Sequence, residues 1–230
     1  TRVIFQNQDD LLQFQNDHLV NVGQVDVIRG SGVDVDRLHV SPLPKNNPEV
    51  VLPARMLWNK GVGEFARAAE ILRAEGTPAK FILAGDVDEN NPAAVPFATL
   101  QEWQTAGAVE WIGWQEDMAS VYSSASIVCL PSYREGLPKT LIEAAACGRP
   151  LIAADAPGCR EVVIPGETGF LCKPRDAISL ADCLRRLLGD REEQERMGRN
   201  ARKLAEKEFS LERIIKETLM VYSKLQVDGN

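Results

Sequence analysis

Two glutamates, Glu135 and Glu143, stand eight positions apart around a turn that could bind an anion. The turn, residues 134–138, reads Arg-Glu-Gly-Leu-Pro and follows an apolar run that ends at Leu130. A helical pattern begins directly after it, so free backbone N–H groups should point outward at a helix N-terminus, where partial positive charge favours an anion. Two acids beside such a site suit a ligand that carries both phosphate and several hydroxyl groups. A sugar nucleotide is a ligand of this kind.

Two cations follow another predicted strand. An apolar run ends close to Arg55, a short loop carries Lys60, and a helical pattern starts at Gly61. Cations at the carboxyl end of a strand, next to a helix N-terminus, suit a diphosphate. Taken alone, these charges are explained equally well as ordinary loop residues. Together with the glutamate pair, they favour a binding site.

Three further segments give weaker signals. The turn Gly-Ser-Gly-Val-Asp, residues 30–34, is flexible and can approach an anion, but it lacks the GxGxxG spacing of dinucleotide sites. Gly85 follows a strand pattern and would let a ligand approach the backbone closely. Backbone groups near Ile112, between Trp111 and Trp114, could hold a base, although these tryptophans could equally be core residues.

Other residue types offer little catalytic chemistry. Segments 34–36 and 86–88 have the Asp-x-Asp spacing that can hold a metal on a diphosphate, but capping of turns is the commoner use and the one we favour. His18 and His39 have no cysteine or second histidine at ligand spacing. No serine or cysteine occupies a nucleophile elbow.

Bulk composition narrows the class of protein. The 230 residues suffice for one large α/β domain or two small ones. A net charge of −7 argues against broad nucleic-acid binding, which requires a basic face. The five cysteines are an odd number without CxxC spacing and indicate buried thiols in a reducing compartment. No apolar run is long enough to span a bilayer, and no signal peptide is visible, so we expect a soluble, cytoplasmic protein.

Short apolar runs alternate with helical patterns along the chain. This alternation predicts an α/β fold with a Rossmann-like parallel sheet covered by helices on both faces. In such folds ligands bind at the carboxyl ends of the strands, where the residues above lie. The strand candidates are 3–5, 25–28, 50–53, 80–84, 109–112, 126–130, 151–153 and 169–171. The helical patterns between them are 9–15, 61–75, 93–105, 118–124, 137–147, 160–164 and 177–188.

The two ends of the sequence suggest a fragment of a longer protein. A strand pattern starts at Thr1 without an initiator methionine. A final helix after Ser210 carries an apolar stripe at helical spacing, which needs a partner surface. Segment 41–48 is rich in proline and is the best candidate for a linker. The stripe consists of Leu211, Ile214, Ile215, Leu219, Tyr222 and Leu225.

The ordered motifs resemble those of retaining GT-B glycosyltransferases of family 4. The resemblance is to the carboxyl-terminal, donor-binding half of a GT-B fold, and it covers almost the whole chain. The segments that carry it are 30–34, 55–61, 83–85, 135–150 and 166–171.

This resemblance implies a role for each motif. Arg55 and Lys60 would bind the donor diphosphate and stabilise the charge on the leaving group. Glu135 would face the hydroxyls of the donor sugar, and Glu143 would accept hydrogen bonds from the ribose. On this basis the catalytic residues are Arg55, Lys60 and Glu135, and the donor-binding residues are Ser31, Gly32, Gly85, Ile112, Gly136, Leu137, Pro138, Thr140, Leu141 and Glu143.

The resemblance also implies a reaction and a domain division. A hexosyl or N-acetylhexosaminyl group would pass, with retention and without metal or cofactor, from a UDP- or GDP-type donor to a glycan or lipid-linked acceptor. Bacterial surface polysaccharide synthesis, with peripheral attachment to the inner face of the membrane, is the expected setting. Residues 1–20 would cross over from an acceptor domain, 21–209 would bind the donor, and the 210–230 helix would pack toward the acceptor domain. This part alone is expected to transfer little or no sugar.

Two other functions remain open on the sequence. A GT-B sugar-nucleotide epimerase would share the fold, but the Arg55–Lys60 segment and the glutamate pair fit a transferase better. A non-catalytic module that binds nucleotide sugars would keep the same donor site.

Overall fold

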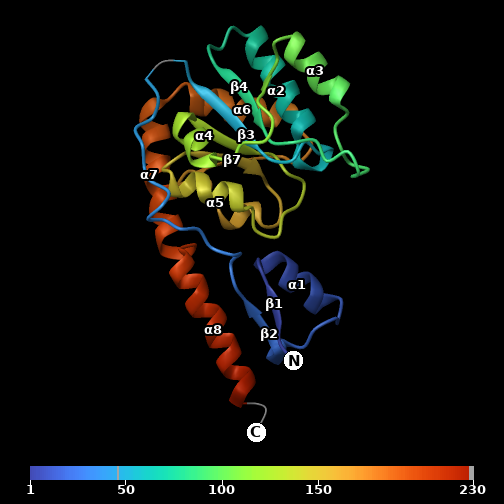
Figure 1. The fold of residues 1–230 in the computed structure, drawn as a ribbon, viewed down its shortest axis with the longest axis vertical. Helices are drawn as coiled ribbons and strands as arrows, with labels where there is room; N and C mark the ends of the chain where they lie inside the picture. Colours follow the sequence, from blue (N-terminus) through green and yellow to red (C-terminus); the bar gives the residue numbers. More distant parts are fainter. Residues whose placement is uncertain (46, 228–230) are drawn as a thin grey trace.

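The computed structural model describes residues 1–45 and 47–227, and it has two lobes (Figure 1). The larger lobe is an α/β sandwich built on a six-stranded sheet. The smaller lobe contains a two-stranded sheet and one helix, and the long final helix runs alongside it. Asn46, in the predicted linker 41–48, and residues 228–230 of the predicted 210–230 helix lie outside the described residues.

The large sheet is wholly parallel and changes direction at its centre. Its strand order is β5-β4-β3-β6-β7-β8, so the chain builds outward from β3 to one edge and then returns to start β6 on the other side of β3. The carboxyl ends of the neighbouring strands β3 and β6 therefore form a topological switch point. Ligands of open α/β sheets bind in the crevice outside such a point. The strands are β3 (Glu49–Pro53), β4 (Lys80–Ala84), β5 (Glu110–Trp111), β6 (Ile127–Leu130), β7 (Leu151–Ala154) and β8 (Gly169–Cys172).

Helices cover both faces of this sheet, as the sequence predicts. Successive strand residues point to opposite faces, so Val50 and Leu52 join one hydrophobic cluster and Val51 joins the other. The first cluster is covered by α2 (Val62–Ala74), α3 (Phe97–Thr105) and α6 (Ala177–Leu188), and the second by α4 (Met118–Ser124), α5 (Lys139–Ala146) and α7 (Arg191–Glu208).

Two predicted helices differ from the structure. The 93–105 pattern becomes a helix only from Phe97, because Pro96 takes an extended conformation at its N-terminus. The 160–164 pattern is a single turn of 3₁₀-helix, η3 (Cys159–Glu161), which follows Gly158 at a φ of 76°. The other 3₁₀ turns are η1 (Val22–Gln24) and η2 (Trp58–Lys60).

The smaller lobe joins the two ends of the chain. Strand β1 (Val3–Phe5) pairs in parallel with β2 (Val25–Val27), and α1 (Gln8–Asn16) connects them. Helix α8 (Leu211–Val227) buries Ile214 and Val221 against Ile28, just beyond β2. The lobe thus takes residues from both sides of position 20, where the sequence suggested a boundary. Five of the six residues in the predicted stripe stay exposed in the described part of the chain: Leu211, Ile215, Leu219, Tyr222 and Leu225.

Arg149 is buried completely just beyond the C-terminus of α5. Its guanidinium donates to the carbonyl oxygens of Cys147 (3.2 Å) and Ala125 (3.0 Å) and to the main chain and hydroxyl of Ser41. A cation in this position satisfies carbonyls left free at a helix end. Arg149 thereby ties Ser41, the first residue of the predicted linker, to the large lobe.

None of the helices in the described residues combines the length and the hydropathy required to cross a bilayer.

Candidate functional site

Lys60 and Glu135 meet at the switch point. Lys60 ends η2, seven residues beyond β3, and Glu135 lies in the loop that follows β6. The Lys60 ammonium Nζ donates to Glu135 Oε1 over 2.5 Å, and both side chains are largely buried. The sequence predicted both residues separately for this site, and the structure brings them into contact.

The two loops are held together by their backbones. Gly61 has a φ of 75°, and a Cβ there would lie only 2.3 Å from the carbonyl oxygen of Pro131. The backbone N–H of Tyr133 donates to the carbonyl of Asn59 over 3.0 Å. Only glycine permits both this conformation and this approach. Lys60 and Glu135 therefore sit on loops whose relative position is fixed.

Lys60 and Glu135 line a cavity of about 210 Å³. The N-terminus of α5 borders it through Lys139 and Thr140. Pro138 at the N-cap contributes no side-chain hydrogen bond, so the first N–H groups of α5 keep their partial positive charge for a ligand. Six of the predicted residues line this cavity: Arg55, Lys60, Glu135, Leu137, Pro138 and Thr140.

Arg55 is the more exposed of the two predicted cations. Its side chain is 60% exposed and donates to Asp88 Oδ2 over 2.6 Å. We expected segment 86–88 to cap a turn, but the side-chain contact of Asp88 is this ion pair. Asp34 does cap a turn, because its Oδ1 accepts from the N–H groups of Asp36 and Arg37. Among the described residues, no group of three or more His, Cys, Asp or Glu side chains is arranged to hold a metal ion.

Glu143 lines a second, larger cavity of about 610 Å³ together with Ser31 and Gly32. Its Oε2 accepts from the buried hydroxyl of Tyr122 over 3.0 Å. Burial, reinforced by the nearby Glu143 charge, raises the pKa of Tyr122 well above its ordinary value, so the phenol remains a donor. Lys139 lies 3.8 Å from Glu143 Oε1 and lines both cavities. The two glutamates thus serve adjacent cavities that meet at the first turn of α5.

The remaining four predicted residues line neither cavity. Gly85, at a φ of 146°, leaves room for the carbonyl of Ala54. A Cβ added at Gly85 would lie only 2.0 Å from that carbonyl oxygen. Packing of one loop on another therefore explains this glycine without a ligand. The carbonyl of Ile112 accepts from Gln115 Nε2 over 2.6 Å, and the backbone N–H of Ile112 donates to the carbonyl of Leu83. The other two are Gly136, in the turn beside Glu135, and Leu141, which is buried in the core.

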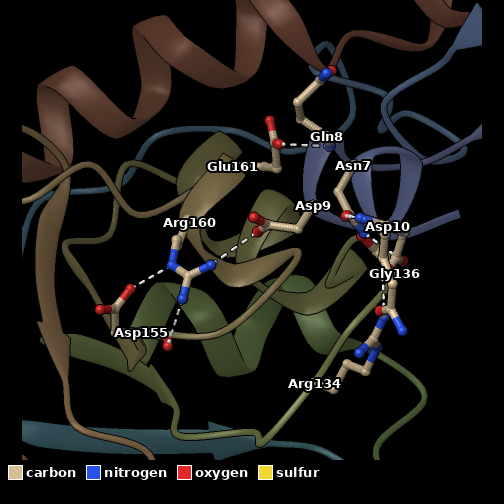
Figure 2. Close-up of polar contacts among 10 residues, drawn as sticks. Asn7, Gln8, Asp9, Asp10, Arg134, Gly136, Asp155, Arg160 and Glu161 are labelled. Carbon is tan, nitrogen blue, oxygen red and sulfur yellow. Dashed lines mark hydrogen bonds and ion pairs between the residues drawn. The ribbon is translucent and has the colours of Figure 1, made fainter. Parts of the chain in front are cut away.

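Sequence reasoning missed several contacts of the site. The pair Lys139 and Glu143 has the i,i+4 spacing of a helical ion pair and could have been found. Tyr122 lies 21 positions from Glu143, and no local pattern links them. Gly136 accepts a hydrogen bond from Asn7, 129 positions away in the smaller lobe (Figure 2).

Comparison with known proteins identifies the family of the chain. A sequence profile of the glycosyl transferases of group 1 matches residues 36–204. The chain belongs to this family. The matched range contains every residue that lines the smaller cavity and all but two of the predicted site residues, Ser31 and Gly32, which line the larger cavity.

The relatives of this group 1 chain are glycosyltransferases. It is 34% identical over 154 residues to N,N'-diacetylbacillosaminyl-diphospho-undecaprenol alpha-1,3-N-acetylgalactosaminyltransferase of Campylobacter jejuni, over 67% of this chain and 39% of that protein. It superimposes on sucrose-phosphate synthase from Thermosynechococcus elongatus with a TM-score of 0.84 and 27% identity, over 98% of this chain and 58% of the other. HepE of Anabaena, solved in complex with UDP, shares the fold at a TM-score of 0.85 and 23% identity, over 97% and 64%. The solved structures confirm the predicted GT-B fold, and the chain spans about half the length of its curated relatives.

Proposed function

We propose that the protein binds a nucleotide-diphosphate sugar and takes part in transferring the sugar to an acceptor. The observation that carries this proposal is the Lys60–Glu135 pair in a cavity at the β3/β6 switch point, bordered by the N-terminus of α5. A cation and a helix N-terminus suit the diphosphate. A carboxylate suits sugar hydroxyls, because it accepts hydrogen bonds at both of its oxygens.

Each cavity would take one part of the donor. In the smaller cavity Lys60 and Arg55 hold the diphosphate and stabilise the negative charge that develops on the departing nucleotide. Glu135 leaves Lys60 and accepts hydrogen bonds from the sugar. In the larger cavity Glu143, held by Tyr122, accepts hydrogen bonds from the ribose.

The finer assignment draws on the relatives. A UDP- or GDP-type donor fits the UDP bound by HepE, and a hexosyl or N-acetylhexosaminyl group fits the activity named for the Campylobacter protein. That name and the capsule synthesis protein CapM of Staphylococcus aureus support a glycan or lipid-linked acceptor in surface polysaccharide synthesis. We infer transfer without metal, since Lys60, Arg55 and α5 supply the positive charge at the diphosphate. Retention of configuration is proposed from the resemblance to the retaining GT-B enzymes. A peripheral position at the inner face of the membrane would bring the enzyme to a lipid-linked acceptor.

A thermal-shift panel tests the donor class. UDP-glucose, UDP-N-acetylglucosamine, UDP-N-acetylgalactosamine, GDP-mannose, ADP-glucose and TDP-glucose are each added to the protein, with and without EDTA. A ligand at about 100 times its Kd stabilises the fold by about 2.7 kcal/mol, so a true donor raises the melting temperature, and EDTA leaves the rise unchanged. If none of the six raises it, the proposed function is wrong.

Calorimetry on single variants tests the assigned roles. Lys60→Ala and Glu143→Ala each remove a charged hydrogen-bonding group and should weaken binding of the best ligand about tenfold or more. The matched control is Lys173→Ala, an exposed lysine that lines neither cavity. Unchanged affinity in the two site variants would contradict the assigned roles.

A further inference from the structure

The smaller lobe touches the turn that carries Glu135 (Figure 2). The N-terminus of α1 points at this turn, and the side-chain amide of Asn7 donates from Nδ2 to the carbonyl of Gly136 over 2.7 Å. Arg134, one residue before Glu135, donates to Asp10 and, over 2.9 Å, to Gln13 of α1. Contacts between the lobes thus flank Glu135 on both sides, and further contacts join Asp9 and Gln8 to Arg160 and Glu161.

Asn7 makes more bonds than a helix cap requires. Its Oδ1 accepts from the N–H of Asp10 over 2.7 Å, which is the capping bond of α1. A serine, threonine or aspartate would make this bond equally well. The amide of asparagine adds two donors, and both are used, one by Asp10 Oδ2 (2.8 Å) and one by the carbonyl of Gly136. The side chain is completely buried, so no water competes for these bonds.

The opposite side of the turn is held by backbone contacts. The N–H of Glu135 donates to the carbonyl of Pro157 over 3.2 Å. A Cβ on Gly158 would lie 2.4 Å from the carbonyl oxygen of Glu135 and 2.7 Å from that of Gly136. The turn therefore lies between Gly158 of the large lobe and Asn7 of the smaller lobe. If the Asn7 bond is removed, Arg134 still ties the turn to α1, but the carbonyl of Gly136 loses the donor that fixes it.

We propose that Asn7 is a positioning residue for sugar recognition. It fixes the carbonyl of Gly136 and so sets the direction in which the neighbouring Glu135 presents its carboxylate. This inference rests on the proposed function, since it assigns to Asn7 the orientation of the group that reads the sugar. It also means that the sugar end of the donor senses the smaller lobe through Asn7, whereas Glu143 at the ribose end is held by Tyr122 of the large lobe.

Two variants separate this role from lobe docking in general. Asn7→Ser keeps the capping oxygen of α1 and loses the donor to Gly136. Asp9→Ala removes the ion pair to Arg160 (2.9 Å), another contact between the lobes, and leaves the Asn7–Gly136 bond in place. Each variant and the wild type are studied by hydrogen exchange of the 131–141 segment without ligand. Calorimetry then measures binding of UDP and of the UDP-sugar from the panel that stabilises the wild type most.

The expected results are specific to Asn7. Loss of one buried hydrogen bond should speed exchange in the 131–141 segment, and should weaken UDP-sugar binding about fivefold while UDP binding stays within about twofold. Asp9→Ala should leave both the exchange of this segment and the ratio of the two affinities unchanged. Unchanged exchange in Asn7→Ser, or equal loss of UDP and UDP-sugar affinity, would overturn the positioning role. Wild-type protein that binds UDP but no UDP-sugar would instead refute the proposed function, and the inference with it.

Discussion

At the scale of single residues, the charge of Lys60 is neutralised by a carboxylate of the same site. Lys60 is paired with Glu135 over 2.5 Å. A diphosphate that takes Lys60 must displace the carboxylate, which then needs hydrogen-bond donors of its own. The hydroxyls of a sugar provide them, but a free nucleoside diphosphate does not. The pair should therefore favour the sugar nucleotide over the free nucleotide.

Glu135→Gln tests this discrimination. Without the carboxylate, Lys60 is free for phosphate, so UDP should bind about fivefold more tightly, while UDP-sugar gains less because it loses an acceptor for its hydroxyls. Calorimetric titration with both ligands measures the ratio of the affinity for UDP-sugar to the affinity for UDP, which should fall in the variant. Glu192→Gln, an exposed position in the first turn of α7, is the control. A ratio that does not fall would show that the Lys60–Glu135 pair plays no part in the selection.

Tyr122→Phe addresses the other glutamate. The variant keeps the buried ring and removes the hydroxyl that donates to Glu143 over 3.0 Å. A less well oriented Glu143 should weaken UDP and UDP-sugar equally, by about fivefold, because both ligands contain the ribose. Tyr222→Phe on the exposed face of α8 is the matched control. A loss confined to UDP-sugar would place Glu143 at the sugar instead.

At the scale of elements, the backbone contact between η2 and the end of β6 holds the two loops of the site in register. Gly61→Ala should lower the free energy of unfolding by more than about 2 kcal/mol, because it combines a left-handed φ with a Cβ placed 2.3 Å from Pro131. Gly76→Ala is a close control, with a φ of 78° and nothing within 4 Å of the added Cβ, and should cost only about 1 kcal/mol. Urea unfolding of both variants gives the comparison. Equal losses would mean that the contact at Gly61 is easily relaxed.

The elements themselves could be predicted because their signals are local. The strands at 127–130 and 151–154 are buried on both faces of the sheet, and the sequence predicted strands at 126–130 and 151–153. The Lys60 and Glu135 loops could be predicted because strand ends in parallel sheets share one edge. The bonds of Tyr122 to Glu143 and of Asn7 to Gly136 could not, since residues remote in sequence meet only after the lobes and helices have packed.

At the scale of the whole molecule, one carboxylate joins both ends of the described chain. Asp26 of β2 accepts from Arg2, before β1, and from Lys224 near the end of α8 (2.8 Å). The Arg2 hydrogen bond, together with Lys224 and against the effect of burial, lowers the pKa of Asp26 below its ordinary value of 3.8. A carboxyl group whose pKa is lowered by folding stabilises the folded protein at pH values above its ordinary pKa. This stability is lost as the pH falls through the pKa of the folded state.

Asp26→Asn should show this dependence directly. At neutral pH the variant should melt below the wild type, and the difference should shrink as the pH falls below the ordinary carboxyl value of 3.8 toward the lowered pKa of folded Asp26. Melting curves by circular dichroism across this range provide the measurement. Asp36→Asn, at an exposed position, is the matched substitution. A difference that stays constant down to the lowest pH would mean that the charge of Asp26 does not link β2 to Arg2 and α8.

The buried Arg149 has a consequence for ionic strength. Its charge lies at the negative pole of α5 and offsets it, which leaves the positive pole at Lys139 and Thr140 facing the smaller cavity. Dissolved ions screen exposed charges such as Arg55 but have little effect on a guanidinium without solvent contact. The part of the attraction for a phosphate that Arg55 supplies should therefore fall as salt is added, while the charge of Arg149 keeps its effect on the end of α5.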